Sequence, residues 1–310
     1  NVKLLHNKKY MRAHYGNLMV CGSVWTCPVC ASKISERRKA ELIQGFNNWP
    51  GGLVLVTLTI RHNKKDKLAE SLAVIDRAYK LLTHGRGWQD IKTLFGISGS
   101  VSNLEITYSD NNGWHPHKHI VYLVDNNINV DLFDAVLSAR WLKYLKASGG
   151  YGLEGVALTC VAVTSQKNRV AEYISAHEKE PKKELWTIES ELTKAYYKSS
   201  SSFWSFLDDW IMDVTTFKEK QKLIKEYAAC TKGRRSVVFS RGLRDLLNIG
   251  QDKNDLEISQ EQEENSELLL TLAREIWQEV VKKNKRGELL KVASNGSLED
   301  VIVFLDNICL

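Results

Sequence analysis

The sequence predicts an α+β protein in which a ferredoxin-like antiparallel sheet carries helices on one face, preceded by a cysteine-rich module and followed by a helical region. Three observations lead to this fold class. The 310 residues are 43% hydrophobic and 26% charged, enough to bury a core in one large domain or two modest ones. Between residues 53 and 180, β-branched apolar runs and segments of helical spacing follow the order β–α–β–β–α–β. After Pro181 helical patterns dominate.

Each element follows from its local pattern. Apolar runs rich in β-branched residues predict strands, and apolar residues repeated every three or four positions predict helices. The turn Ser109–Gly113 joins two of the strands. In chain order we expect a helix at 31–49, a strand at 53–61, a helix at 66–83, strands at 101–108 and 116–124, a helix at 130–145, a strand at 156–163 and a helix at 168–180.

These elements suggest a division into five parts. An acidic segment with few large apolar residues predicts a linker between the two helical parts. The expected parts are a metal-binding module at 1–35, the sheet core at 36–182, a helical accessory region at 183–250, the acidic linker at 251–266 and a final helical unit at 267–310.

The bulk composition narrows the class of protein. The net charge of +6 suits a polyanionic partner. No run approaches the roughly 20 apolar residues that cross a bilayer, and residues 1–10 do not resemble a secretory signal, so we expect no membrane partner. Without an initiator Met, the chain is expected to begin inside a longer protein. Six unevenly placed cysteines do not suggest a disulfide framework, and we expect a reduced, cytoplasmic protein.

The pattern with the most chemistry is the segment Trp114–Val121. Successive strand residues point to opposite faces, so His115, His117 and His119 share one face with about 7 Å between neighbours. Glu105, on the preceding strand, can place a carboxylate beside them. Two imidazoles and one carboxylate can bind a divalent metal and leave positions open for a phosphate oxygen. The alternative is a cluster of solvated or core histidines.

A second candidate metal site lies near the N-terminus. Cys27 and Cys30 form a Cys-x-x-Cys knuckle, and Cys21 precedes it. Thiolates favour tetrahedral zinc over magnesium or manganese, so we expect a structural zinc ion. The alternative is three buried thiols. The fourth ligand is open among His14, which is the nearest, His6 and Cys160.

Basic and aromatic side chains could bind nucleic acid. A solvated face explains the basic clusters equally well, and core packing explains most of the tryptophans better. Clusters of arginine and lysine could grip phosphates, and exposed indoles could stack on unpaired bases. The candidates for phosphate contacts are Arg37, Arg38, Lys39, Lys232, Arg234, Arg235, Arg241 and Arg244, and those for stacking are Trp25, Trp88 and Trp114.

Four segments resemble one known family. GWHPHKHIVYL (113–123) is similar to the second motif of the HUH endonucleases, and LVTLTIRH (55–62) resembles the first. CGSVWTCPVCASKISERR (21–38) and EYAACTKGRRSVVFSRGLRDLL (226–247) resemble the Rep_1 branch, the replication initiators of small rolling-circle plasmids. The resemblance runs from about residue 15 to 247, with the motifs in the family's order.

The resemblance implies a nuclease that transfers a strand of origin DNA, single-stranded or in a hairpin, to a tyrosine hydroxyl. This leaves a 5′-phosphotyrosine and a free 3′-OH. His117 and His119 match the motif histidines and Glu105 the third ligand, for Mn²⁺ or Mg²⁺. His115 would be an outer-shell residue or an alternative ligand. Thr57 and Thr59 would orient ligands or DNA, or are ordinary strand threonines.

Tyr173 lies where the family's catalytic tyrosine is found, on a helix after the last strand of the sheet. Tyr196 and Tyr197 are alternatives, because some HUH enzymes use paired tyrosines. The sequence departs from the family around Tyr173: Arg169 replaces a glutamate one turn before it, and Ala176 or His177 replaces a lysine one turn after it. Glu172 is a doubtful substitute, since neighbouring helical residues point about 100° apart.

The resemblance also implies partners and leaves alternatives open. No phosphate loop of the GxxxxGK[ST] type is present, so a host helicase would unwind the DNA and a host polymerase would extend the 3′-OH. The alternatives are a transposase or relaxase with the same site, and a zinc-containing DNA-binding regulator without catalysis. The last has no need of three histidines facing a carboxylate.

Overall fold

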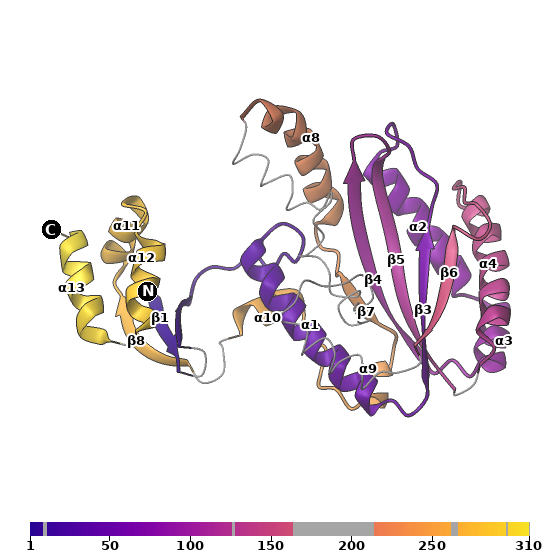
Figure 1. The fold of residues 1–310 in the computed structure, drawn as a ribbon, viewed down its shortest axis with the longest axis horizontal. Helices are drawn as coiled ribbons and strands as arrows, with labels where there is room; N and C mark the ends of the chain where they lie inside the picture. The colour runs from indigo at the N-terminus through magenta and orange to yellow at the C-terminus, as the bar shows by residue number, and fades with distance from the viewer. Residues whose placement is uncertain (9–10, 126–127, 164–213, 262–265, 296, 310) are drawn as a thin grey trace, which may run out of the picture. The chain divides into compact units, whose positions relative to one another are not determined.

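The structure is a mixed α+β fold with two antiparallel sheets (Figure 1). The computed structural model describes residues 1–310 except 9–10, 126–127, 164–213, 262–265, 296 and 310. The chain forms two units. One joins Asn1–Gly22 to Leu256–Leu310, and the other is Ser23–Asp255.

The larger unit is built on a five-stranded sheet. Every neighbouring pair is antiparallel, in the order β6-β3-β5-β4-β7. The strands are β3 (Gly52–Thr59), β4 (Gly99–Ser109), β5 (Gly113–Val124), β6 (Leu158–Val163) and β7 (Val237–Phe239). The first four confirm the strands expected from the sequence. The fifth adds a short strand to the region 183–250, where helices were expected.

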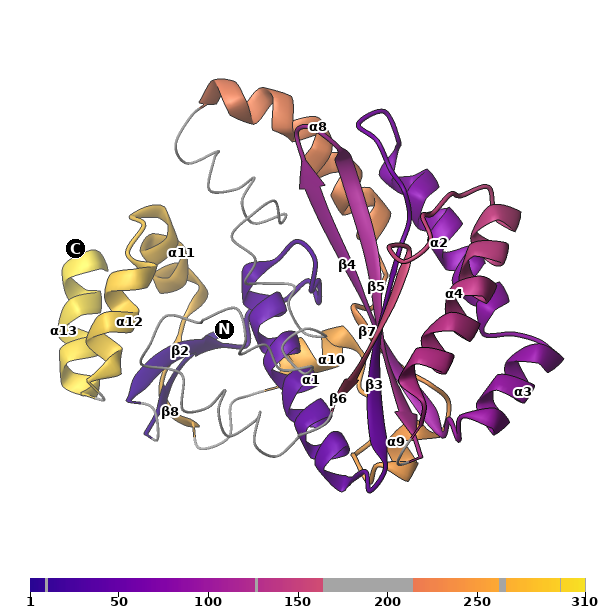
Figure 2. The ribbon, with the colours of Figure 1, turned by 45° about the vertical axis from the view of Figure 1, so that its right-hand side comes forward.

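Helices α2 (Leu68–Leu82), α3 (Arg86–Leu94) and α4 (Val130–Ala147) cover one face of this sheet (Figure 2). The predicted helices at 66–83 and 130–145 are confirmed, whereas α3 was not predicted. The helix expected at 168–180 lies outside the described residues. Tyr122 of β5 contacts Trp88 of α3 and Phe133 of α4 on this face. The even-numbered residues of β5 therefore point into the main core.

The opposite face is covered by apolar residues over only part of its length. Helix α1 (Pro28–Asn48), which confirms the helix expected at 31–49, contributes Leu42 and Phe46. They pack with Val121 and Leu123 of β5 and with Leu243 of α9 (Leu243–Leu246). The odd-numbered residues before Val121, which include the three histidines, lie beyond this apolar cluster on the same face.

The segments after the sheet differ from the expected helical region and linker. Helix α8 (Val214–Thr231) precedes β7. The expected linker at 251–266 holds α10 (Asp255–Gln260), in which Ile258 is 2% exposed, and ends at a strand. Buried Ile258 and the aspartates Asp252 and Asp255, which both pair with Arg38, give this acidic segment a structural role. None of the described helices has the length and hydropathy needed to cross a membrane.

The smaller unit joins both ends of the sequence. Strand β1 lies between β2 and β8, antiparallel to both. Its elements are β1 (Val2–Asn7), β2 (Arg12–Gly16), β8 (Ser266–Leu272), α11 (Arg274–Lys282), α12 (Arg286–Ser294) and α13 (Leu298–Cys309). The expected division into a module at 1–35 and a helical unit at 267–310 therefore differs from the structure. Strand pairing across the length of the sequence has no local signal.

We expect Leu4→Ala to destabilise the smaller unit by about 2–5 kcal/mol, because a large buried side chain is removed. Leu4 is fully buried and packs in one core with Leu272, Val280 and Leu289. Hydrogen exchange followed by mass spectrometry should show faster exchange in β1 and β8 and unchanged exchange in β4 and β5. Leu268→Ala is the matched control, since Leu268 is 54% exposed. Equal exchange in Leu4→Ala and wild type would contradict this account.

Candidate functional site

Three histidines of β5 lie side by side on the open part of the sheet face. Strand β5 is central, between β3 and β4, so each histidine has a neighbour on both sides. In register, His117 lies between Thr59 and Glu105, and His119 lies between Thr57 and Asn103. The ring centroids of His115 and His117 are 3.7 Å apart, and the ring centroids of His117 and His119 are 6.1 Å apart. The three rings thus point the same way, as the alternation of the strand predicts.

His119 is held at both ring nitrogens. Its Nε2 lies 2.9 Å from Oε2 of Glu105, and its Nδ1 lies 3.1 Å from Oγ1 of Thr57. His119 is 6% exposed, so these bonds fix the ring in a dry environment. Thr59 forms a similar bond, 2.7 Å long, to Nε2 of His115. The structure therefore brings Glu105, the histidines and both threonines together.

The donor set suits a divalent cation. Adjacent ligands of an octahedral ion with bonds of about 2.1 Å are roughly 3 Å apart. The 2.9 Å between His119 Nε2 and Glu105 Oε2 is a hydrogen-bond distance that is close to that separation. Among the described residues, only the three cysteines place three donors all within 4.8 Å of one another, so His117 would have to turn toward this pair to share an ion with it. His117 comes from the same face and lies opposite Glu105 in register. These donor types do not select one divalent ion, because imidazole suits zinc, copper, iron and nickel, whereas carboxylate suits magnesium, calcium and manganese.

Two further residues lie on this face and were not predicted as site residues. His62 stacks on His115, with ring centroids 3.9 Å apart and planes 23° apart. Asn103 is 4% exposed and lies opposite His119. His62 ends the segment that resembles the first family motif, which is the available signal for it. Asn103 shares the odd-numbered face of β4 with Glu105, so strand alternation could have identified it.

Gly113 allows the loop that carries His62 to come close to the histidines of β5. It begins β5 with φ of 75°, which favours glycine. A Cβ at this position would lie 2.8 Å from Cα of Lys64. The absence of a side chain lets the loop after β3 approach the β4–β5 hairpin.

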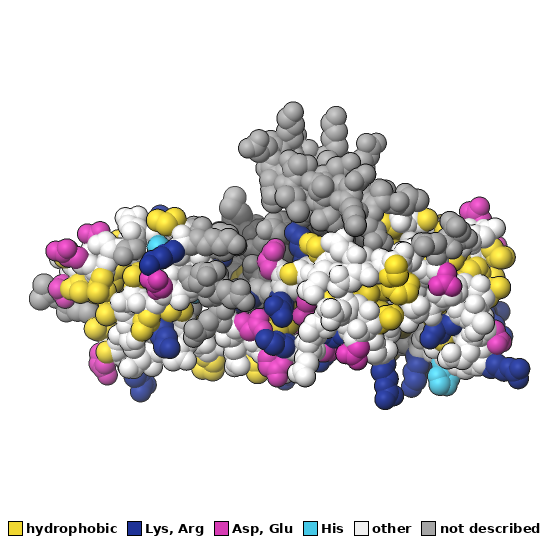
Figure 3. Space-filling model, turned by 90° about the horizontal axis from the view of Figure 1, so that it is seen from below, with side chains coloured by type: hydrophobic (Ala, Val, Ile, Leu, Met, Phe, Trp, Pro, Cys, Tyr) yellow, Lys and Arg dark blue, Asp and Glu magenta, His cyan; other side chains and the backbone are white. Residues whose placement is uncertain are grey.

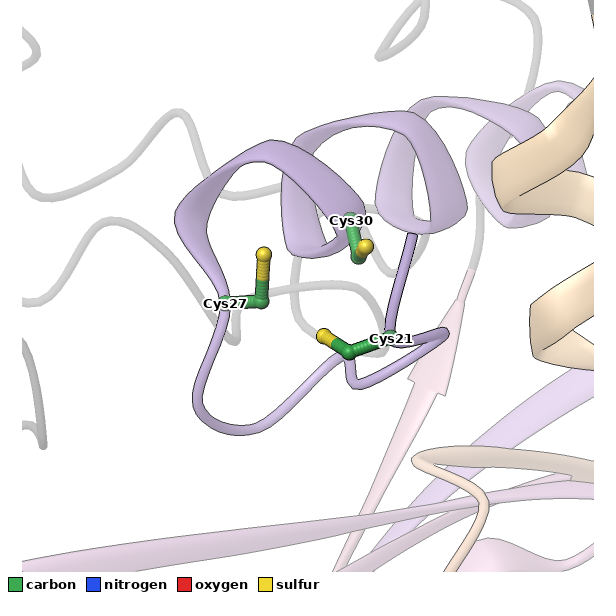
Figure 4. A group of neighbouring side chains, drawn as sticks. All are labelled: Cys21, Cys27 and Cys30. Carbon is green, nitrogen blue, oxygen red and sulfur yellow. The ribbon is translucent and has the colours of Figure 1, made fainter. Parts of the chain in front are cut away.

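The three N-terminal cysteines form a compact group (Figure 4). Their sulfur atoms all lie within 4.8 Å of one another. Tetrahedral zinc with bonds of about 2.3 Å to sulfur needs ligands somewhat under 4 Å apart, so small adjustments suffice. Cys27 is the residue just before α1 and makes no side-chain capping bond, whereas Pro28 at the first helical position favours the start of a helix there. The group fits a metal such as zinc.

The candidates for the fourth zinc ligand lie in regular strands. His6 of β1 has its Nε2 3.1 Å from the carbonyl oxygen of Ser294. Cys160 of β6 interacts with Asp134, and burial together with that carboxylate raises the pKa of its thiol. His14 belongs to β2, opposite Leu5 in register. Of the described residues, the compact group contains the three cysteines alone.

Arg38 is not the exposed phosphate contact that its basic neighbours suggested. It is 2% exposed and bonds to Glu41, Asp252 and the carbonyl of Lys253. Burial raises the pKa of Glu41, but hydrogen bonds from Arg244 and Arg38 outweigh this effect and hold that pKa below its ordinary value. Arg38 therefore belongs to a buried ion network that fastens α1 to residues 252–255.

The other basic candidates differ in exposure, and several of them are ion-paired. Arg234 bonds to Asp76 at 2.7 Å, and Arg235 pairs with Asp252. Lys232 and Arg241 are exposed, and so is Arg37, which pairs with Glu41 at 3.4 Å. On the face shown in Figure 3, lysine and arginine side chains lie interspersed with acidic ones.

The three tryptophans considered for base stacking belong to the core. Trp25, Trp88 and Trp114 are 5%, 7% and 3% exposed. Core packing, the alternative that the sequence left open, is therefore confirmed for them. The predicted nucleophile and its neighbours lie outside the described residues: Tyr173, Glu172, His177, Tyr196 and Tyr197.

The fold and the two donor clusters define a class: an α+β protein with a histidine–carboxylate face on a central antiparallel sheet and a separate three-cysteine group. A family model identifies the family. Residues 17–286 match Rep_1, the replication protein family, and the chain belongs to it.

Two curated relatives, both from Streptomyces, are similar. A protein named Protein rep from Streptomyces lividans is 25% identical over 293 residues, which cover 75% of this chain and 64% of that protein. A neomycin resistance protein from Streptomyces cyanogenus is 28% identical over 134 residues, covering 34% of this chain and 31% of that protein. The chain thus spans less than two thirds of either relative. No solved structure matches it.

Proposed function

We propose that this chain initiates rolling-circle replication of a plasmid by nicking and rejoining one strand of origin DNA. The observation that carries the proposal is the bonded pair Glu105–His119 with His117 beside it, on adjacent strands of a Rep_1 family protein. A DNA-binding regulator without catalysis has no use for such a donor set.

The topology supports an HUH nuclease core. Strands β3, β4, β5 and β6 follow one another in the chain but lie in the order β6-β3-β5-β4, with α2 and α4 in the two connections. That order is the one expected of a ferredoxin-like sheet. It places the histidine strand in the centre, where flanking strands hold both sides of the site rigid.

The proposed reaction is a transesterification. The hydroxyl oxygen of Tyr173 attacks phosphorus, the bond between phosphorus and the 3′ oxygen breaks, and a 5′-phosphotyrosine forms. The proton lost by the tyrosine is balanced by the proton gained by the 3′ oxygen. The covalent link retains the phosphodiester energy, so the same protein can reseal the strand without ATP.

The residues on the face divide this task. Glu105, His117 and His119 would hold Mn²⁺ or Mg²⁺, which offsets charge on the non-bridging phosphate oxygens. Thr57 fixes the ring of His119, and Thr59 fixes that of His115. Hydrogen bonds from neighbouring side chains to the rings of metal-binding histidines orient those ligands.

The cysteine group, the exposed basic residues and the host proteins have separate roles in this proposal. The cysteine group would hold structural zinc, and the exposed residues Arg37, Lys232 and Arg241 would contact phosphates. A host helicase and a host polymerase would act with the chain at the origin.

We expect Tyr173→Phe to abolish the covalent adduct, because the ring remains but the nucleophilic oxygen is gone. The assay incubates the protein with Mn²⁺ or Mg²⁺ and labelled single strands tiled across the replicon that encodes it. Adducts are separated on a denaturing gel. Tyr196→Phe and Tyr197→Phe serve as controls and should form adducts as wild type does.

Adduct formation by Tyr173→Phe would refute the choice of nucleophile. Cutting of strands outside a replication origin would favour the transposase or relaxase alternative. Specific binding by the wild type without any cutting in either metal would favour the regulator.

A further inference from the structure

Helix α8 contacts the histidine strand at Trp114, the residue just before His115. The indole is 3% exposed, and its Nε1 donates a 2.9 Å hydrogen bond to Oε2 of Glu226. The ring of Tyr227 stacks on it, with centroids 5.9 Å apart and planes 26° apart. Two successive residues of α8 therefore hold one side chain of β5, by a charge-assisted bond and by ring stacking.

Glu226 also holds a second element. Its other oxygen, Oε1, accepts the backbone N–H of Leu68, the first residue of α2, at 2.8 Å. The residue before α2, Lys67, provides no side-chain cap. A carboxylate at a helix N-terminus satisfies an otherwise unbonded donor and is favoured by the helix dipole. One carboxylate thus ties the histidine strand to the first helix of the opposite sheet face.

Trp25 extends this contact to the loop between Cys21 and Cys27. It is 5% exposed and meets Tyr227 edge to face, with centroids 6.3 Å apart and planes 71° apart. Its Nε1 donates a 2.7 Å hydrogen bond to the carbonyl of Arg234. The aromatic rings of Trp25, Tyr227 and Trp114 therefore form a continuous stack from the cysteine loop to the histidine strand.

We propose that Glu226, Tyr227 and Trp25 are positioning residues for the histidine metal centre, which they hold through Trp114. This clamp fixes the end of β5 from which His115 and His117 project, and it makes the shape of the metal centre depend on the cysteine loop. The inference rests on the proposed function only in assuming that the histidine face binds a divalent cation.

Glu226→Ala removes both hydrogen bonds, so we expect Mn²⁺ affinity to fall by about 10-fold, as for loss of a supporting residue around metal ligands. Glu226→Gln should recover part of the loss, because its amide oxygen can accept one of the two bonds. Free Mn²⁺ is titrated by electron paramagnetic resonance on the full chain. In nicking assays, kcat should fall while KM for DNA is unchanged. Glu70→Ala is the control, since this α2 carboxylate is 69% exposed in its side chain.

The aromatic stack is tested with two variants of Tyr227 and one of Trp25. Tyr227→Phe keeps the ring and should bind Mn²⁺ like wild type, whereas Tyr227→Leu and Trp25→Leu should weaken binding. Circular dichroism and thermal melting identify any variant that fails to fold.

The outcomes separate the two proposals. Wild type that binds Mn²⁺, with Glu226→Ala and Trp25→Leu folded and binding it equally well, overturns the clamp alone. Wild type that binds no Mn²⁺ overturns the metal centre and, with it, the clamp. Weaker binding in Tyr227→Leu, retained binding in Tyr227→Phe and partial rescue in Glu226→Gln support positioning.

Discussion

Replacing His117 with alanine should reduce metal-dependent nicking by about 1,000-fold or more, since a bound cation contributes several kcal/mol to stabilising the transition state. His117 shares its strand face with His119 and lies opposite Glu105. Its loss would leave the proposed cation with an incomplete set of protein ligands. Binding to origin DNA should change little, because base and phosphate contacts are expected outside the metal centre.

The measurement compares initial rates of nicking with the affinity for the same labelled strand. His84→Ala is the matched control: His84 is exposed, follows α2 and lies away from β5 in the sequence. It should nick at the wild-type rate. Nicking by His117→Ala at a rate near that of wild type would eliminate the proposed metal centre. A collapsed melting transition in the same variant would show that His117 supports folding instead.

Arg38→Ala should lower the free energy of unfolding of the larger unit by about 3–5 kcal/mol, as expected when one member of a buried ion network is removed. Arg38 is 2% exposed and is the cation that Glu41 and Asp252 share at hydrogen-bond distance. Without it Glu41, whose side chain is 6% exposed, keeps only Arg244 and the more distant Arg37 as partners, and a large buried side chain is lost from α1. Urea denaturation, followed by circular dichroism, measures the loss.

Arg37→Ala is the matched control, one residue earlier on the same helix. Its side chain is 44% exposed, so we expect a change of about 0.5 kcal/mol or less. At temperatures where both variants are folded, Arg38→Ala should bind origin DNA like wild type. If Arg38→Ala kept full stability but lost DNA binding, Arg38 would be a phosphate contact after all.

The central sheet could be predicted because its strands carry local patterns. The residues of β3 alternate between buried Val54, Val56 and Leu58 and less buried Thr57 and Thr59. Period-two alternation is also sufficient by itself to place the three histidines on one face. The position of Glu105 beside the histidines could also be predicted, because the two strands of a hairpin pair with each other and Glu105 lies on the strand before the histidines.

Burial of polar and aromatic residues could not be predicted in the same way. The basic run around Arg38 reads as a solvated face, and its burial depends on Asp252, 214 positions further along the chain. For Trp114 the sequence favours core packing over base stacking, but it does not show that the indole bonds to Glu226, 112 positions further along the chain. Strand β7 has three residues within a basic segment, too short for a periodic signal.

Strand β1 has a consequence for synthesis on the ribosome. It can pair early with β2, but its other partner, β8, is made only after all of the larger unit. Domains fold as units while the chain grows, so Ser23–Asp255 can finish before β8 exists. Until then β1 presents bare backbone donors and acceptors along one side, the feature that makes unpaired strands prone to join other chains. Slow translation between β1 and β8 should therefore favour aggregation of nascent chains.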